Sequence, residues 1–193
     1  MSAGLVLASG SATRQALLRD AGVAFRVVKS GVDEAPFKHP GRDPVEVART
    51  LADAKAAAVA AREPGATVIG ADQVLALDGA ILDKPGTRTR LVANLYAMAG
   101  RRHSLLTVVS VWRDGARLWS WRERADLHMR PLDSAAIADY VAAAPDDVLD
   151  CAGGYQVEGA GIRLFERIDG DWHGILGLPL LPLLRWLRGE GLA

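Results

Sequence analysis

The sequence lacks three features that would assign it to particular classes of protein. It has one cysteine, Cys151, so no disulfide can form within the chain. Its most apolar run, ILGLPLLPLLRWL, holds two prolines and an arginine and is too short to cross a bilayer. The N-terminus lacks the basic start, the long apolar stretch and the cleavage site of a signal peptide. We therefore expect a cytoplasmic protein with no membrane partner.

A surplus of charge of either sign is absent as well. The 23 basic residues balance the 23 acidic ones, so no overall positive field favours nucleic acid as a partner. Half of the residues are apolar, and a chain of 193 residues is long enough to bury a core. Neither an internal repeat nor a low-complexity tract interrupts it. The sequence predicts one domain over residues 1–193.

Strand and helix patterns alternate along the chain, which predicts an α/β fold around a mixed sheet. A strand is expected at 5–8 and a helix at 11–21, ended by Gly22. The clearest helix covers 43–65, with Asp43 as its cap and Pro44 in its first position. Further predicted elements are a strand at 23–28 and helices at 89–100, 133–144 and 178–187.

An Asp-Gly turn at 78–79 predicts a hairpin. With a two-residue loop, Gln73 falls opposite Lys84, and Asp72 lies next to Gln73. Strict alternation puts Asp72 and Lys84 on opposite faces, so a bulge or a frayed strand end is needed for both to serve one site. The alternative is an exposed hairpin with an ordinary ion pair at its base.

A second Asp-Gly turn, at 114–115, predicts a longer hairpin from about 103 to 128. It carries Trp112, Trp119 and Trp121. Aromatic side chains on a hairpin either fill the core or supply a surface for a homodimer. We expect these three to fill the core.

The opening stretch LVLASGSATR predicts a strand that enters a helix through a turn of small residues. The first N–H groups of such a helix are unpaired, and with the helix dipole they form an anion site. Ser9 and Ser11 add hydroxyl groups, and Arg14 follows one turn later, able to bind a phosphate or carboxylate. Alternatively, Ser11 is only a helix cap and Arg14 is solvated.

Lys55 stands out by its spacing in the predicted helix 43–65. It follows Leu51 by four residues and precedes Val59 by four, so it lies on the inward face. A lysine there either extends to the protein surface or reaches into a cleft that holds an anion.

A glycine-rich stretch, CAGGYQVEGAGIRLFERIDGDWHGILGLP, sets Glu158 among glycines. Glycines permit a ligand to approach the backbone, and they can equally serve loop geometry alone. The four histidines show no zinc-ligand spacing, so we predict no structural zinc.

Together these segments resemble the Maf family of nucleoside triphosphate pyrophosphatases. The resemblance covers nearly the whole chain, from LVLASGSATRQALLRDAG through VDE, LADAKA, GADQV, LDKP and GGYQVEGAG to IDGDW and GLPL. It implies an elongated, twisted mixed sheet flanked by helices, with two lobes and a central cleft. It also implies house-cleaning hydrolysis of a nucleoside triphosphate to the monophosphate and pyrophosphate in the cytoplasm, with Mg²⁺ or Mn²⁺, and is compatible with a homodimer.

The resemblance also implies roles for individual residues. The nucleotide would be bound by Ser9, Ser11, Arg14 and Gln73, and the phosphates also by Lys55 and Lys84. The acidic residues Glu34, Asp72 and Glu158 would hold the metal or water and, with the two lysines, form the catalytic set; Asp72 would accept the proton.

One departure leaves the preferred nucleotide open. The family opening usually has a proline followed by two arginines, or by an aromatic residue and an arginine in the 7-methyl-GTP branch, whereas this chain has Ala12, Thr13 and Arg14. Gln73 and Glu158 look closer to the 7-methyl-GTP branch. Two alternatives are a pyrophosphatase for deaminated purines and a non-catalytic nucleotide-binding regulator of cell division.

Overall fold

The computed structural model describes residues 4–39 and 41–193, which form a seven-stranded mixed sheet flanked by helices. The strand order is β2-β1-β3-β5-β6-β7, and β4 also pairs with β3. β1 is parallel to β2 and β3, and the other pairs are antiparallel. The strands are β1 (Leu5–Leu7), β2 (Arg26–Val27), β3 (Thr67–Leu77), β4 (Ala80–Leu82), β5 (Arg102–Arg113), β6 (Ala116–Met129) and β7 (Phe165–Asp169). The predicted α/β fold is confirmed.

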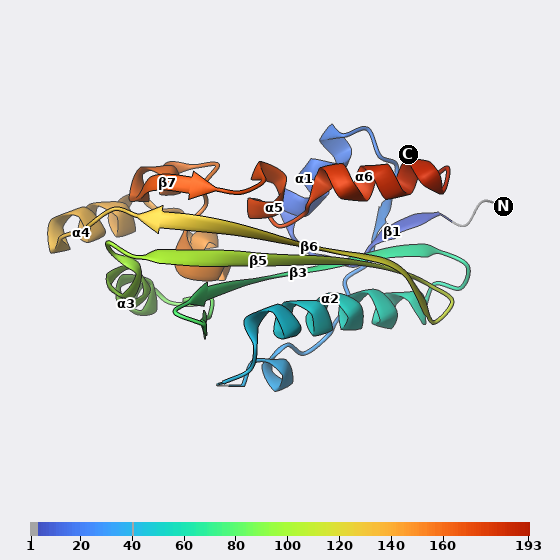
Figure 1. Ribbon diagram of the computed structural model, residues 1–193, viewed down its shortest axis with the longest axis horizontal. Helices are drawn as coiled ribbons and strands as arrows, with labels where there is room; N and C mark the ends of the chain where they lie inside the picture. The colour runs from blue at the N-terminus through green and yellow to red at the C-terminus, as the bar shows by residue number, and fades with distance from the viewer. Residues whose placement is uncertain (1–3, 40) are drawn as a thin grey trace.

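The long strands β3, β5 and β6 follow the long axis of the molecule (Figure 1). In that view α2 lies on one side of them, α1 and α6 lie on the other, and α3 and α4 sit at one end. The helices are α1 (Ala12–Asp20), α2 (Pro44–Ala60), α3 (Arg88–Met98), α4 (Ser134–Ala143), α5 (Trp172–Ile175) and α6 (Leu180–Gly189). Short 3₁₀ turns are η1 (Ala35–Phe37), η2 (Asp146–Asp150), η3 (Ala152–Gly154) and η4 (Ala160–Leu164). Among these described helices none combines the length and apolarity needed to cross a membrane.

Side-chain caps fix where the main helices begin. The Ser11 hydroxyl accepts the Arg14 N–H at the start of α1, and the Asp43 carboxylate accepts the Glu46 N–H at the start of α2. The end of α2 was predicted at 65, but the helix stops at Ala60, because the turn before Pro64 already leaves the helical path. The strand predicted at 23–28 is also shorter, since only residues 26–27 pair with β1.

Two of the hydrophobic clusters lie at opposite ends of the same long strands. One contains Leu91 and Leu95 of α3 with Ile137 of α4 and Leu127 of β6. The other is formed by β1, α1 and α6 packed on the opposite end of β3 and β5, with Leu7, Leu18, Leu183 and Leu187 fully buried. We call the part of the molecule around the second cluster the first lobe, and the part around α3 and α4 the second lobe.

The tryptophans of the second hairpin correct one prediction. Trp112 and Trp119 pack beside the cores, but Trp121 is 43% exposed. Trp119 stacks on Trp121 and on Trp186 of α6, with ring centroids 6.5 and 6.0 Å apart. Core filling is therefore wrong for Trp121, because β6 extends past the packed layer at this point and leaves the outer ring of the stack in solvent.

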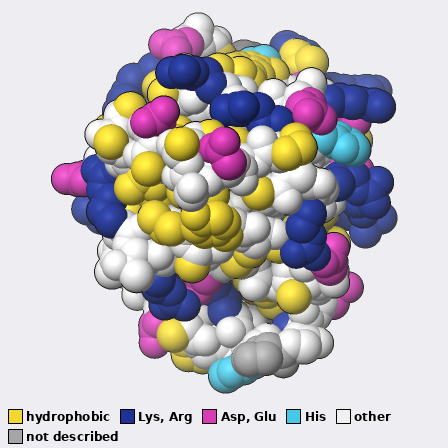
Figure 2. Space-filling model, turned by 90° about the vertical axis from the view of Figure 1, so that its left-hand side faces the viewer, with side chains coloured by type: hydrophobic (Ala, Val, Ile, Leu, Met, Phe, Trp, Pro, Cys, Tyr) yellow, Lys and Arg dark blue, Asp and Glu magenta, His cyan; other side chains and the backbone are white. Residues whose placement is uncertain are grey.

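Figure 2 looks at the end of the molecule that carries α3, α4 and β7. Hydrophobic side chains gather near the middle of this end, with charged side chains around them. Tyr96 of α3 and Ile162 of η4 are exposed. Apolar surface of this extent is normal for a folded chain.

A gap in the sheet edge positions the functional residues. On one side, β5 pairs with β3 continuously from Val68 to Ala76. On the other side, β1 pairs only with residues 67–69 and β4 only with residues 75–77. Within the described part of the chain, residues 70–74 therefore have no strand neighbour on this edge. Asp72 and Gln73 lie in the gap, and their side chains leave the strand toward opposite faces.

Candidate active site

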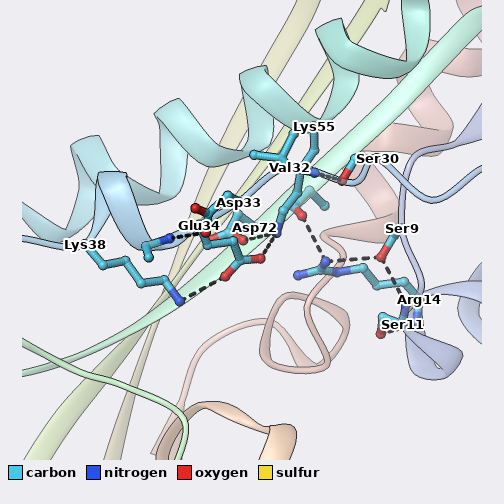
Figure 3. A network of polar contacts seen from close by, with 12 residues as sticks. Ser9, Ser11, Arg14, Ser30, Val32, Asp33, Glu34, Lys38, Lys55 and Asp72 are labelled. Atoms are coloured by element: carbon cyan, nitrogen blue, oxygen red, sulfur yellow. Dashed lines mark hydrogen bonds and ion pairs between the residues drawn. The ribbon is translucent and has the colours of Figure 1, made fainter. Parts of the chain in front are cut away.

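A cluster of alternating charges occupies this gap (Figure 3). Lys55 Nζ lies 2.6 Å from Glu34 Oε1 and 2.6 Å from Asp72 Oδ1, so one ammonium group joins two carboxylates. The other Glu34 oxygen is 2.9 Å from Lys38 Nζ, which is 3.1 Å from Asp83. Residues from a loop, α2 and β3 are thus joined in one network.

The close packing of α2 on β3 brings Lys55 to Asp72. At Gly70 an added Cβ would lie 2.4 Å from the Ala52 carbonyl oxygen, so only glycine permits this approach. Lys55 is 9% exposed and lies on the helix face that packs against the sheet, as its spacing predicts. The side chain of Lys55 reaches into the pocket and does not extend to the protein surface.

The two carboxylates bound to Lys55 have opposite pKa shifts. Burial raises the pKa of Asp72, and the positive charges of Lys55 and Arg14 offset only part of this effect. Burial also opposes the charge of Glu34, but Lys55 and Lys38 outweigh it and lower the pKa of Glu34 to about 2. A pair of acids with diverging pKa values is typical of active sites, where one acid takes protons and the other stays ionised.

Arg14 is held in place by backbone oxygens. Its Nε donates to the Gly177 carbonyl at 2.8 Å, and its NH1 donates to the Ala71 carbonyl at 2.9 Å and to Ser9 Oγ at 3.4 Å. The Ala71 carbonyl belongs to the unpaired edge of β3, so the guanidinium replaces a missing strand there. Burial lowers the pKa of Arg14, and attraction to Asp72 partly restores it. An arginine remains charged under such a shift.

Ser9 and Ser11 support Arg14 from the turn before α1. Ser9 is buried, and its hydroxyl accepts from Arg14 and from the Ser11 N–H at 3.2 Å. Ser11 caps α1 and lines the same pocket as Arg14. The capping role and the site position therefore occur together.

The second lobe supplies the opposite wall of the pocket. Lys84 and Glu158 line it together with Arg14, Lys55 and Asp72. β4 ends at Leu82, so Lys84 follows a frayed strand end, which is one of the two alternatives that the register required. Both Lys84 and Glu158 are exposed, and within residues 4–39 and 41–193 neither side chain forms an ion pair.

The glycines near Glu158 serve the packing of their own loop. Gly154 has φ +81°, and an added Cβ would lie 2.2 Å from Leu91 Cδ1. At Gly161 an added Cβ would lie 2.4 Å from the Gln156 carbonyl oxygen. The two glycines therefore serve the geometry of the loop, which is one of the two alternatives predicted for them. The same loop places Gln156 and Glu158 in the lining of the pocket.

Two features of the site were not predicted from sequence. Lys38 holds the second oxygen of Glu34, yet it sits in irregular chain after η1, where no periodicity identifies it. Gln73 lines the pocket, but its side-chain nitrogen donates to Thr107 and to carbonyls of α5. Contact between Gln73 and a substrate remains a prediction.

The acidic residues fit a hard divalent cation in their chemistry. Asp72 Oδ2 is buried and has no hydrogen-bond partner in the described chain, and carboxylate oxygens are the ligands that Mg²⁺ and Mn²⁺ prefer. No three acidic, histidine or cysteine side chains in the described ranges come together as a metal cluster. Glu158 is on the far wall, so its predicted place beside Glu34 and Asp72 as a ligand remains a prediction.

A family model described as Maf-like protein matches residues 4–190. The chain belongs to the Maf family. A nucleoside triphosphate pyrophosphatase of Sphingopyxis alaskensis is 48% identical, and the match covers 98% of each chain. A 7-methyl-GTP pyrophosphatase of Brucella abortus is 45% identical, also over 98% of each chain. This Maf-family chain thus has similar relatives with two different substrate names.

Solved structures resemble this Maf-family chain more distantly. A nucleoside-triphosphatase, or dITP/XTP pyrophosphatase, of Mycobacterium abscessus is 15% identical, with a TM-score of 0.45 over 98% of this chain and 95% of that one. A HAM1 protein of Coxiella burnetii is 19% identical, with a TM-score of 0.41 over 65% and 72%.

Proposed function

We propose that the protein hydrolyses a nucleoside triphosphate to the monophosphate and pyrophosphate. The observation that carries the proposal is Lys55 between two carboxylates with diverging pKa values, beside a backbone-held Arg14. Membership of the Maf family and the printed activities of its relatives support it.

The basic side chains and the first turn of α1 would bind the triphosphate. Arg14 NH2 is the terminal nitrogen not used by the backbone carbonyls, so it can reach a phosphate oxygen. Lys84 lies across the pocket without an ion pair in the described chain, which leaves its ammonium group available. Cations on both walls offset the substrate charge that Asp72 and Glu34 would otherwise repel.

Asp72 would act as the base. Its raised pKa makes it a better proton acceptor than Glu34, which stays ionised and holds Lys55. Water would add to the α-phosphorus and pass a proton to Asp72, while the bond from this phosphorus to the bridging oxygen breaks and pyrophosphate leaves. Lys55 would hold the Asp72 carboxylate in position through the 2.6 Å contact.

A divalent metal would be held by Asp72 and Glu34 together with phosphate oxygens of the substrate, with Glu158 as the third predicted ligand. When bound, Mg²⁺ or Mn²⁺ would neutralise phosphate charge. We further propose a cytoplasmic location and a single Maf-like domain.

The test is pyrophosphate release by the purified protein from canonical, 7-methylated and deaminated triphosphates, with and without Mg²⁺ or Mn²⁺. We expect turnover of at least one of them and equimolar monophosphate and pyrophosphate. Asp72→Asn is the matched control, because it keeps the shape of the side chain. Nucleotide binding without turnover by the wild type would favour the regulator instead, and release of inorganic phosphate alone would contradict the proposed bond cleavage.

A further inference from the structure

The side-chain amide of Gln73 bonds to the short helix α5, which follows β7. The two N–H groups on its Nε2 share three acceptors, which are Thr107 Oγ1 at 2.8 Å, the Gly174 carbonyl at 3.1 Å and the Ile175 carbonyl at 3.0 Å. Both carbonyls only accept hydrogen bonds, so the nitrogen and not the oxygen of the amide must face them. The donor end of Gln73 is therefore occupied by the protein itself.

Thr107 completes this arrangement. It is the direct neighbour of Gln73 across β3 and β5, and it is 1% exposed. Its hydroxyl donates to the Gly174 carbonyl at 2.9 Å while it accepts from Gln73. The half-buried Gln73 and the buried Thr107 thus both donate to the same carbonyl of α5.

The same turn holds Arg14. The Gly177 N–H donates to the Gly174 carbonyl at 3.0 Å, and the Gly177 carbonyl accepts from Arg14 Nε at 2.8 Å. A Cβ added at Gly177 would lie 3.3 Å from Arg14 Nε, so the turn lies directly against the guanidinium. Contacts therefore run without a break from Gln73 through residues 174–177 to Arg14.

We infer that Gln73 is a positioning residue, which fixes the guanidinium of Arg14 through the turn at 174–177 and does not itself read the base. For its kinetic consequences the inference rests on the proposed function. A displaced Arg14 weakens contact with phosphates, which every nucleoside triphosphate shares. Loss of Gln73 should then reduce the use of all bases by the same factor, whereas a base-reading residue would change their ranking.

The first experiment needs no substrate. In protein with ¹⁵N-labelled arginine, the Arg14 Nε–H signal is assigned by comparison with Arg14→Lys. Gln73→Met keeps the length of the side chain and removes its donors, and should shift this signal and speed its exchange with solvent. Gln15→Met is the matched control, because the Gln15 amide contacts Arg19 on the surface of α1. An unmoved Arg14 signal in folded Gln73→Met protein would overturn the inference, whether or not the protein hydrolyses nucleotides.

The second experiment compares KM and kcat over the nucleotide panel. Gln73→Met should raise KM about tenfold for every base, the size expected for a lost hydrogen-bond set. Thr107→Val should have a smaller effect of the same kind, and Thr107→Ser, which keeps the hydroxyl, should restore wild-type values. The two Thr107 variants also test the positioning role if Gln73→Met fails to fold. A change in base ranking, or equal effects of Thr107→Val and Thr107→Ser, would contradict positioning.

A double-mutant cycle links the effect to Arg14. Lysine has no Nε–H donor for the Gly177 carbonyl, so in an Arg14→Lys background Gln73→Met should change KM by less than about twofold. If the fold-change in KM of the double variant equalled the product of the two single-variant fold-changes, Gln73 would act independently of Arg14. Absence of turnover in the wild type would instead reject the proposed function and leave the NMR result to decide the inference.

Discussion

The two walls of the pocket differ in how far their charged groups are organised. On the wall from the first lobe, Lys55 bonds Glu34 and Asp72 and is 9% exposed, and Arg14 bonds two backbone carbonyls. On the wall from the second lobe, Lys84 and Glu158 are exposed and have no ion pair within the described ranges. We call the first the paired wall and the second the open wall.

The two walls should differ in how much their side chains must rearrange during catalysis. Groups that are already fixed need no reorganisation when charge develops, which is where electrostatic catalysis gains most. Exposed lysine and glutamate side chains must lose rotamer freedom when substrate arrives. We therefore expect the chemistry to depend on the paired wall and substrate capture to depend more on the open wall.

The largest contrast should be between Asp72→Asn and Glu158→Gln. Loss of the base on the paired wall should lower kcat about 10³-fold, while the open-wall variant should lose about tenfold. Steady-state pyrophosphate release measures both. Binding of a non-hydrolysable triphosphate analogue should survive in Asp72→Asn, and near-normal turnover by this variant would remove Asp72 from its role.

Asp72→Asn should not lose stability. Because burial raises the pKa of Asp72 in the folded protein, ionisation costs stability as pH rises through that pKa. Near neutral pH the asparagine variant should therefore unfold at a temperature no lower than the wild type. A large drop in Tm would mean that lost turnover reports unfolding.

Replacement of Lys55 and of Lys84 should have different effects on the free energy of unfolding. Lys55→Met leaves two carboxylates without their shared cation and should cost about 3 kcal/mol of unfolding free energy. Lys84→Met removes an exposed side chain without an ion pair in the described chain and should change it by less than about 0.5 kcal/mol. Urea unfolding measures both at neutral pH, and equal values would remove the distinction between the walls.

Gly177→Ala should disturb Arg14 with a smaller effect. Gly177 has φ +95°, so alanine is strained there, and its Cβ would lie 3.3 Å from Arg14 Nε. We expect a rise in KM of about fivefold with kcat less affected, from weakening of one charged hydrogen bond. Gly191→Ala is the matched control, since Gly191 also has positive φ but open space around it. An equal rise of KM in both variants would contradict the explanation.

The smallest expected effect is the change with pH in the stability that Glu34 contributes. The pKa of Glu34 is lowered to about 2 in the folded protein, so its stabilising effect is present above about pH 4.5 and is lost as pH falls through 2. Because the side chain is 28% exposed, Glu34→Gln should cost only about 1 kcal/mol at pH 6, and less at pH 3. Urea unfolding at both pH values checks this.

The paired wall was more predictable from sequence than the open wall. Lys55 follows the period of a long helix whose cap at Asp43 is visible in the sequence, and the structure confirms its inward position. The two-residue turn fixed the register of Leu77 with Ala80, which the structure also contains. These features depend on local rules of helices and hairpins.

Long-range contacts escaped prediction for a physical reason. The gap at 70–74 arises because β1 and β4 share one edge of β3, and nothing in β3 itself encodes where those neighbours end. The attachment of Gln73 to the carbonyls of residues 174 and 175 joins segments that lie 101 and 102 residues apart in the sequence. The positions of Lys84 and Glu158 depend on loops, where neither period 2 nor period 3.6 applies.

Hydrogen–deuterium exchange tests the difference between the walls most directly. Backbone exchange would be followed by mass spectrometry with and without a non-hydrolysable triphosphate analogue and divalent metal. We expect slower exchange on binding at residues 83–86 and 153–161, with little change at residues 70–74 and in the middle of α2. Equal slowing on both walls, or slowing confined to the paired wall, would show that the open wall is not the part that becomes ordered when substrate binds.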